Sequence, residues 1–313
     1  MKKILITGCA GFIGFHLSKK LSKDYLILGI DSFEKNKFSN IAIDRVKKLK
    51  KIKNFKFKKV SIANYKTLKK IYDNNKFFAV INLAATPGVR ASFSNPDIYF
   101  KNNLQGFYNI YLLSIKQNVE LFMFGSSSSV YGNNKNSNTD NPISFYAATK
   151  KCNEIISHSF LQSSSTKIVG LRFFTVYGPW GRPDMAVYKF SRNIDLNKPI
   201  DVYNHGHHSR DFSYIDDTTQ SIFLILKNLK KLKQYQLFDI GKGKTDSLKN
   251  LIYLIRKNFI KKIKINKISM QKGDVKTTKA NIKELKKVTN YTPKTTLKIG
   301  IENFMKWYKG YHK

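Results

Sequence analysis

The sequence predicts a doubly wound parallel α/β sheet with a smaller C-terminal α/β lobe. Short apolar runs alternate with segments that carry lysines and apolar residues at helical spacing, which is typical of strands covered by helices. Several of these runs are almost continuously apolar, as strands buried on both faces of a sheet are. A glycine-rich turn follows the first run, and the strand–helix rhythm changes after residue 174.

The first half of the chain supplies the expected parallel sheet. Strands are expected at residues 4–7, 25–31, 55–62, 78–85, 121–126 and 167–174. The helices expected between them include residues 14–23, 66–74, 97–117 and 146–162. Phenylalanines alternate with lysines at residues 55–58, and this alternation favours a strand with one buried face over a lysine-rich tail.

The elements expected beyond residue 174 form the smaller lobe. A loop rich in glycine and proline is followed by helices at residues 186–197, 216–227, 247–259, 282–289 and 298–309. Strands are expected at residues 200–203, 236–240 and 262–270. We therefore expect a first domain over residues 1–174, to which part of 211–240 returns. The second lobe then comprises residues 175–210 and 241–313.

Composition limits the class of protein. The chain has 313 residues, of which 42% are hydrophobic, so it can bury a sizeable core. Lysine and arginine number 57 against 20 acidic residues, which gives a net charge of +37. Only seven of the basic residues are arginine, the side chain that most often reads DNA bases, so a specific nucleic-acid partner is not expected. The scattered lysines indicate a solvated coat, and weak salt-sensitive polyanion binding is the alternative.

The two cysteines, Cys9 and Cys152, form neither a disulfide framework nor a metal-ligand pattern, which fits a cytoplasmic protein without a metal. The start of the chain resembles a lipoprotein signal ending at Cys9. Only three strongly apolar residues precede that cysteine, too few for an export signal. No run is long enough to span a membrane, so membrane insertion is not expected.

The glycine-rich turn predicts a dinucleotide site. Gly8, Gly11 and Gly14 lie between the first strand and the first helix, where glycine lets the backbone approach a pyrophosphate. The N-terminus of that helix offers free N–H groups to the anion. Asp31 ends the second strand, where a carboxylate accepts hydrogen bonds from ribose hydroxyls and repels a 2′-phosphate. The pattern predicts a Rossmann-type domain that binds NAD rather than NADP.

A tyrosine and a lysine follow at the start of a predicted helix. Tyr146 and Lys150 are four residues apart and share one helix face. Tyrosine has a pKa of about 10 and is a poor base unless a nearby positive charge favours the phenolate. Upstream, residues 126–129 form a serine run at the carboxyl end of a strand, the edge where parallel sheets bind ligands. Either motif alone has an ordinary structural explanation.

Taken together, these motifs resemble the extended short-chain dehydrogenase/reductase superfamily and, within it, the UDP-glucuronate 4-epimerases. The resemblance extends from residue 1 to about residue 310. Its most specific segments are residues 88–90, 147–151, 171–186, 199–206, 210–217 and 271–275. UDP-glucuronate decarboxylases and UDP-galactose 4-epimerases usually carry asparagine at the position of Thr175.

The resemblance implies an isomerase that keeps NAD as a permanent cofactor and interconverts UDP-glucuronate and UDP-galacturonate through a 4-keto sugar. It implies that Tyr146 takes the proton of the 4-hydroxyl and that Ser127 hydrogen-bonds the 4-oxygen. Lys150 would hold the nicotinamide ribose and lower the pKa of Tyr146. Alternatives are a UDP-glucuronate decarboxylase, a 4-epimerase of a neutral or N-acetylated UDP-sugar, or a polyanion-binding protein on a Rossmann scaffold.

The resemblance also assigns binding residues. The implied cofactor contacts are Gly8, Gly11, Phe12, Ile13, Gly14, Asp31, Leu83, Ala84, Ala85, Asn103 and Lys150. The implied substrate contacts are Arg90, Ser126, Ser128, Thr175, Arg182, Tyr203, Arg210 and Asp274. We hypothesise that Thr175, with Ser127 and Ser128, holds the sugar carboxylate so that the keto intermediate keeps its CO₂. Arg182 anchors the nucleotide or closes the site, or else is a surface arginine paired with Asp184.

The chain departs from the family pattern at several positions. The segment 132–145 is short, and residues 61–62 replace an acidic residue that often contacts adenine. His205, His207 and His208 are expected to be surface histidines of a loop. A homodimer is implied, with helices 97–117 and 146–162 meeting across a two-fold axis. Its candidate apolar contacts, which could equally be internal core, are Ile98, Phe107, Ile110, Leu113, Ile155 and Ile156.

Overall fold

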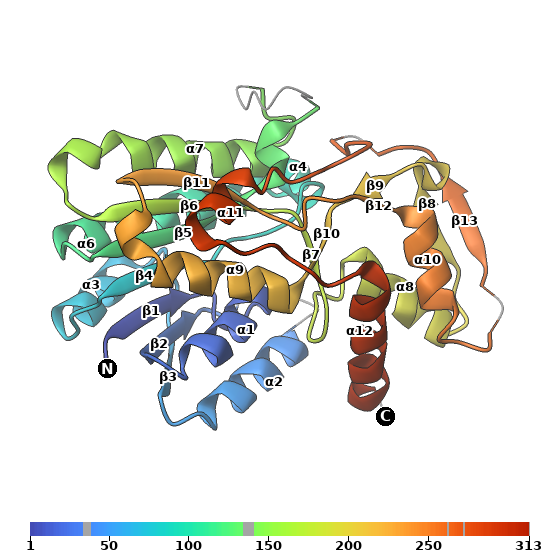
Figure 1. Ribbon diagram of the computed structural model, residues 1–313, viewed down its shortest axis with the longest axis horizontal. Coiled ribbons are helices and arrows are strands. Elements are labelled where there is room, and N and C mark those ends of the chain that lie inside the picture. Colours follow the sequence, from blue (N-terminus) through green and yellow to red (C-terminus); the bar gives the residue numbers. More distant parts are fainter. Residues whose placement is uncertain (34–38, 134–140, 262, 272, 313) are drawn as a thin grey trace.

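A seven-stranded parallel sheet forms the centre of the protein, in the strand order β11-β6-β5-β4-β1-β2-β3 (Figure 1). The computed structural model describes residues 1–33, 39–133, 141–261, 263–271 and 273–312. The strands are β1 (Lys3–Thr7), β2 (Leu26–Asp31), β3 (Phe55–Lys59), β4 (Ala79–Asn82), β5 (Leu121–Ser127), β6 (Lys167–Phe173) and β11 (Tyr235–Ile240). The doubly wound α/β sheet expected from the sequence is confirmed.

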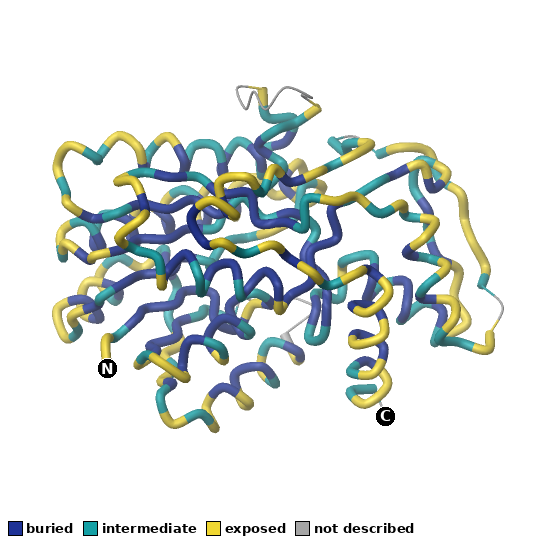
Figure 2. The backbone as a smooth tube through the Cα atoms, viewed as in Figure 1, coloured by how far each residue is buried: buried dark blue, intermediate teal, exposed yellow. Residues whose placement is uncertain are grey.

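Helices cover both faces of the sheet. One face packs against α1 (Phe12–Leu21), α2 (Ser39–Lys50), α9 (Ile215–Lys227) and α11 (Lys283–Thr289). The other packs against α3 (Tyr65–Asp73), α6 (Gly106–Lys116) and α7 (Phe145–Ser159). Successive residues of β1 show the alternation, since Ile4 and Ile6 enter the first core and Leu5 the second. All three are fully buried. The strands of the central sheet are mostly dark blue, the colour of buried residues, in Figure 2.

A third core lies beyond the carboxyl ends of the strands (Figure 1, right). Its helices are α8 (Ala186–Asp195), α10 (Leu248–Arg256) and α12 (Leu297–Tyr311). Short strand pairs complete this lobe. They are β7 (Thr175–Tyr177) with β10 (Phe212–Tyr214), β8 (Ile200–Tyr203) with β13 (Ile265–Ile268), and β9 (Ser209–Arg210) with β12 (Asp246–Ser247).

Part of the C-terminal segment packs on the first domain instead of the lobe. Leu285 and Val288 of α11 belong to the core under the central sheet, although residues 241–313 were expected in the second lobe. Their apolar face lies against α9, which also covers that sheet. The division of the chain into two units at the expected boundaries stays a prediction.

The helix expected over residues 97–117 contains a π-helical turn. Helix α5 (Pro96–Tyr99) leads into a π-helix over Phe100–Gln105, which leads into α6. The short helix α4 (Ala91–Ser94) precedes them, and 3₁₀ turns lie at Ser128–Tyr131, Leu161–Ser163, Asn204–Gly206 and Leu229–Lys231. Among the described residues, no helix combines the length and apolar character needed to cross a membrane.

Candidate active site

The turn between β1 and α1 forms a glycine cradle. Gly8 has a φ of +69°, and a Cβ there would lie 2.7 Å from the backbone nitrogen of Ala84, so only glycine fits. A Cβ on Gly14 would collide with the carbonyl oxygen of Gly8. The glycines therefore let α1 start directly beneath the turn, and its N-terminus faces the space above the strand ends.

A cavity of about 890 Å³ opens over this cradle. Its lining includes seven of the expected cofactor contacts: Gly8, Gly11, Phe12, Asp31, Leu83, Ala84 and Ala85. Four expected contacts lie outside the lining: Ile13, Gly14, Asn103 and Lys150. Arg45, which no sequence motif marks, also lines the cavity. Its guanidinium donates hydrogen bonds to the carbonyl oxygens of Ala10, Trp180 and Gly181. Arg45 thus joins the glycine turn to the loop that carries Arg182.

Asp31 lies at the end of β2 on the wall of this cavity. Its two carboxylate oxygens accept hydrogen bonds from the backbone N–H groups of Ala10, at 3.1 Å, and Phe33, at 3.0 Å. These bonds fix the carboxylate on the wall of the cavity. Ser61 and Ile62 line the same cavity, which makes the wall at those positions uncharged.

The π-helical turn explains the place of Asn103. Its side chain accepts a hydrogen bond from the backbone N–H of Thr86 at 2.7 Å and donates one to the Thr86 carbonyl at 3.1 Å. The neighbouring Asn102 donates to the Thr86 hydroxyl at 2.8 Å. A π turn at a functional site is common, and here two consecutive asparagines hold one loop. Asn103 therefore fixes the cavity wall that follows β4.

The candidate catalytic residues meet at the boundary between β5 and α7. The ammonium of Lys150 lies 5.9 Å from the ring centre of Tyr146 and donates a 2.8 Å hydrogen bond to the carbonyl of Gly125. Burial lowers the pKa of Lys150 to about 8. Burial raises the pKa of Tyr146, while its hydrogen bond with Ser127 and the charge of Arg182 lower it. The three predicted catalytic residues are thus brought together.

Arg182 lies between the cavity and Tyr146. It lines the cavity, and its guanidinium bonds to both carboxylate oxygens of Asp184, at 3.1 and 2.5 Å. The ion pair with Asp184 that the sequence suggested therefore exists, and Arg182 lines the cavity while it is paired. Tyr99 stands edge-on to Tyr146 at 6.3 Å between ring centres and also lines the cavity.

A second cluster gathers residues from distant parts of the chain. The guanidinium of Arg90 lies 4.5 Å from the ring centre of Tyr203. Asp274 accepts a 2.9 Å hydrogen bond from Arg210 and lies 3.8 Å from Arg90. Four expected substrate contacts thus come together. Two arginines beside one carboxylate leave an excess of positive charge, which suits a diphosphate.

His208 also belongs to this cluster, which corrects the expectation of a surface histidine. It is buried, and its Nε2 atom lies 3.8 Å from Asp274, whereas His205 and His207 are exposed. Burial lowers the pKa of His208, and so does Arg210. His208 lies immediately before the two-residue strand β9, so strand periodicity does not mark it, and its burial depends on Asp274, which is distant in the sequence.

The remaining expected contacts are placed less directly. Thr175 is half-buried at the start of β7, where its backbone N–H bonds to the carbonyl of Asp211. Ser128 is half-buried in the turn after β5. The Ser126 hydroxyl points to the interior and donates a 2.6 Å hydrogen bond to Glu154. Of the short 132–145 segment, residues 134–140 lie outside the described residues.

Comparisons with known proteins agree with this geometry. The protein is 40% identical to Protein CapI of Staphylococcus aureus, with 99% of both chains covered. It is 36% identical to a UDP-glucuronate 4-epimerase of Thermodesulfobacterium geofontis, with 97% of this chain and 95% of the relative covered. Among solved structures, a UDP-glucuronic acid 4-epimerase from Bacillus cereus, in complex with UDP-glucuronic acid and NAD, superposes with a TM-score of 0.91 at 30% identity. That superposition covers 99% of each chain.

The family model described as the NAD dependent epimerase/dehydratase family matches residues 4–241. That range begins in β1 and ends just after β11, so it contains the glycine cradle, Asp31 and the Tyr146–Lys150 pair. The observed cavity lies over the same elements. The chain therefore belongs to the NAD dependent epimerase/dehydratase family.

Proposed function

We propose that the protein interconverts UDP-glucuronate and UDP-galacturonate by NAD-dependent 4-epimerisation through a transient 4-keto sugar. The observation that carries this proposal is that Tyr146, Ser127 and Lys150 meet next to residues that line the cavity over the glycine cradle. Relatives named UDP-glucuronate 4-epimerase, similar over nearly the whole chain, support the choice of sugar.

The residues of the site have complementary roles in this chemistry. NAD, when bound over the glycine cradle, supplies the acceptor and later the donor of the hydride at C4 of the sugar. Tyr146 takes the proton of the 4-hydroxyl as a general base and returns it after the sugar has turned over. Ser127 hydrogen-bonds the same oxygen and Tyr146, and both Ser127 and the charge of Arg182 lower the pKa of Tyr146. Lys150, whose ammonium lies 5.9 Å from the Tyr146 ring centre, is assigned to the nicotinamide ribose.

The second cluster holds the nucleotide. Arg210 and Arg90 bind the diphosphate, Asp274 accepts from the uridine ribose, and Tyr203 borders the uracil. The excess positive charge around Asp274 supports this assignment. Because no step of the reaction changes the nucleotide, this cluster contributes affinity and orientation, not bond making.

The carboxylate of the substrate needs a position of its own. Oxidation at C4 creates a β-keto acid, which loses CO₂ when the breaking bond stands perpendicular to the ketone plane. We propose that Thr175, with Ser127 and Ser128, holds the carboxylate away from that alignment, and that Arg182 closes the site over it. Hydrogen bonds to a charged group contribute about 1.5–3 kcal/mol each, enough to favour one conformer.

Product analysis tests the proposed function. The purified protein is incubated with UDP-glucuronate, without added nucleotide, and the sugar is identified by NMR. We expect UDP-galacturonate. Formation of a UDP-pentose with CO₂ would assign a decarboxylase instead. Conversion of UDP-glucose or UDP-N-acetylglucosamine, with UDP-glucuronate untouched, would assign a different sugar to the same site.

We also propose a homodimer, and the structure narrows its contacts. Phe107, Ile110 and Leu113, which the sequence left open, are buried inside the subunit and cannot form an interface. Exposed apolar side chains on α4 through α7 remain available: Phe93, Ile98, Phe100, Tyr108 and Ile155. Light scattering should give twice the 36.2 kDa chain mass at micromolar concentration. A monomer mass would contradict the proposal.

A cytoplasmic location completes the proposal. Both cysteines are free, and Cys9 is buried beneath the glycine cradle, where burial raises the pKa of its thiol. Such a thiol is stable in a reducing compartment. Recovery of the enzyme in the membrane fraction after cell lysis would contradict this location.

A further inference from the structure

The carboxyl end of β5 is fastened to α7 at three successive helical turns. Tyr146, Lys150 and Glu154 are spaced four residues apart and therefore share one face of α7. Each bonds to a different one of three consecutive residues, 125–127, at the end of β5. The first two bonds involve the catalytic residues. The third, from Glu154, has no part in the chemistry derived above.

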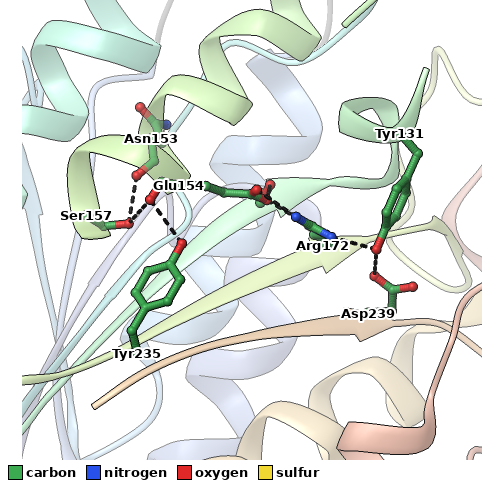
Figure 3. A network of polar contacts seen from close by, with 8 residues as sticks. Tyr131, Asn153, Glu154, Ser157, Arg172, Tyr235 and Asp239 are labelled. Carbon is green, nitrogen blue, oxygen red and sulfur yellow. Dashed lines mark hydrogen bonds and ion pairs between the residues drawn. The ribbon is translucent and has the colours of Figure 1, made fainter. Parts of the chain in front are cut away.

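Glu154 is the centre of a buried ionic contact (Figure 3). Its carboxylate accepts two 2.8 Å hydrogen bonds from the Arg172 guanidinium and a 2.6 Å bond from the Ser126 hydroxyl. The side chain of Glu154 is 3% exposed and that of Arg172 12%. Ser126 and Arg172 are register partners on β5 and β6, so both side chains reach the same point of α7.

The contact continues from Arg172 across the sheet. Arg172 donates a 2.7 Å hydrogen bond to the hydroxyl of Tyr131, and that hydroxyl donates a 2.7 Å bond to Asp239 (Figure 3). Asp239 is the register partner of Arg172 on β11 and accepts a 2.8 Å bond from the backbone N–H of Asn281. A single arginine thus lies between two buried carboxylates.

This network holds the catalytic serine segment at both ends. Ser126 immediately precedes Ser127 and is fixed by Glu154, while Tyr131 ends the 3₁₀ turn that follows Ser127 and is fixed by Arg172 and Asp239. Within the segment, Ser127 accepts a 3.1 Å hydrogen bond from the backbone N–H of Ser129. The outside bonds therefore fix both ends of the segment, and the Ser129 bond fixes the Ser127 hydroxyl within it.

We propose that Glu154 and Arg172 are positioning residues that act through Ser126 and Tyr131 to set the distance between Ser127 and Tyr146. The proposal rests on the function assigned to Tyr146 and Ser127. Ser126 then serves as an anchor to α7 instead of the substrate contact implied by the family resemblance. The Glu154 and Arg172 side chains are only 3% and 12% exposed and bond to each other, so neither is expected to touch cofactor or substrate.

Stability alone is a weak reason for such an arrangement. A buried ion pair is often no more stabilising than apolar residues of the same volume, because both charges must be removed from water. A reaction that needs fixed donors is more demanding, since a displacement of about 1 Å can cost on the order of 10²-fold in rate. The Glu154–Arg172 network can meet this requirement, because it holds the segment that carries Ser127 at both ends.

Ser126→Ala tests the proposal with the smallest change. It removes the hydroxyl that joins β5 to Glu154 and leaves the groups that face Tyr146 in place, namely Lys150, Arg182 and Tyr99. We expect kcat to fall at least about tenfold with KM for the UDP-sugar within about twofold. The acid limb of the kcat–pH profile should move to higher pH, because the Ser127 hydrogen bond that lowers the pKa of Tyr146 is loosened.

Ser157→Ala is the matched control. Ser157 is another buried serine of α7. Its hydroxyl donates to the helix carbonyl oxygens of Asn153 and Glu154 and hydrogen-bonds Tyr235, so it does not bond to the residues at the end of β5. This variant should keep the wild-type kcat and pH profile. An equal loss of kcat in both variants, or an unchanged acid limb in Ser126→Ala, would overturn the proposal.

Tyr131→Phe provides a second test that does not depend on Ser126. It keeps the ring that Arg172 stacks against at 4.8 Å and removes the hydroxyl between Arg172 and Asp239. The same direction of change in kcat and in the acid limb is expected, with the content of bound NAD unchanged. Full activity of Tyr131→Phe with an unchanged pH profile would contradict the proposed positioning role of Glu154 and Arg172. Failure of the proposed function is distinguishable, because the wild-type product identifies the sugar and these variants are compared on that sugar.

Discussion

The cofactor half and the substrate half of the site are built in different ways. The cofactor half is local, because Gly8, Gly11 and Asp31 all belong to the first β-α-β unit. The substrate half joins Arg90, which precedes α4, to Arg210 on β9 and to Asp274 beyond β13. Rigid parallel strands support the first half, whereas two-stranded pairs and loops support the second.

The difference separates what each half can do. Binding of the dinucleotide depends on backbone geometry that the sheet enforces, and only glycine satisfies it at Gly8. Selection of the sugar nucleotide depends on side chains whose spacing depends on how the lobe packs against the sheet. Tyr146, on α7, forms the junction of the two halves, because it hydrogen-bonds Ser127 and interacts with the charge of Arg182, which lines the cavity. Variants in one half should therefore leave the other intact.

The largest expected effect is at this junction. Tyr146→Phe keeps the ring and removes the proton acceptor, so turnover should fall by about 10²–10⁴-fold or more while NAD stays bound. Turnover of UDP-glucuronate is followed by NMR. Tyr72→Phe is the control, because it removes another buried tyrosine hydroxyl, one bonded to Ser114 beneath α3. Near-wild-type turnover by Tyr146→Phe would place the base elsewhere.

The next largest effect tests, by a change in the substrate half, whether the two halves of the site act independently. Arg210→Gln removes the charge that pairs with Asp274 and that we propose binds the diphosphate. Loss of a charge-assisted bond of about 1.5–3 kcal/mol predicts a KM for the UDP-sugar about 10–100-fold higher, with bound NAD unchanged. Arg192→Gln is the control, because Arg192 is paired with Asp195 on the exposed side of α8. Loss of NAD from Arg210→Gln would show that the halves are not independent.

Asp31→Asn tests the same independence of the two halves by a change in the cofactor half. The amide oxygen can still accept from Ala10 or Phe33, but the charge that repels a 2′-phosphate is gone. We expect the preference for NAD over NADP to narrow by roughly tenfold, about 1.4 kcal/mol, at an unchanged affinity for UDP. Equilibrium binding of each dinucleotide to protein freed of its cofactor measures this. An unchanged preference for NAD over NADP would show that Asp31 does not determine cofactor specificity.

Much of the fold could be predicted because its signals are local. The expected strands of the sheet agree with β1, β5 and β6 to within a residue or so at each end, since buried apolar runs and flanking glycines mark them. Helix α2 was not singled out, because lysines at positions 47, 48, 50 and 51 hide its apolar face. That face is formed by buried Ile41, Val46 and Leu49.

Part of the candidate site could also be predicted from local signals in the sequence. Glycines, Asp31 and the Tyr146–Lys150 pair are recognisable from spacing along the chain. Arg45, His208 and the Glu154–Arg172 contact were not, because each depends on neighbours that folding brings together. Their burial is the common feature, since a charged group buried in the fold must find partners. Those partners lie far away in the sequence.

The smallest expected effect concerns the fate of the keto intermediate. Thr175→Val keeps the volume and removes one of the three hydroxyls proposed to hold the carboxylate. Because Ser127 and Ser128 still hold it, the net loss is expected to be only about 0.5–1.5 kcal/mol. Released UDP-4-keto-pentose or UDP-pentose should therefore rise about 2–10-fold relative to epimerised product. Mass spectrometry of the products measures this ratio. Unchanged partitioning at full rate would make Thr175 a packing residue.

In the proposed reaction, C4 loses its hydrogen as hydride and regains the same hydrogen, while Tyr146 transfers only the hydroxyl proton. UDP-glucuronate labelled with deuterium at C4 tests this directly when the reaction runs in ordinary water. We predict that the UDP-galacturonate formed retains the deuterium at C4, as NMR and mass spectrometry would show. Product carrying solvent hydrogen at C4 would contradict hydride transfer and with it the assigned roles of the cofactor cradle and Tyr146.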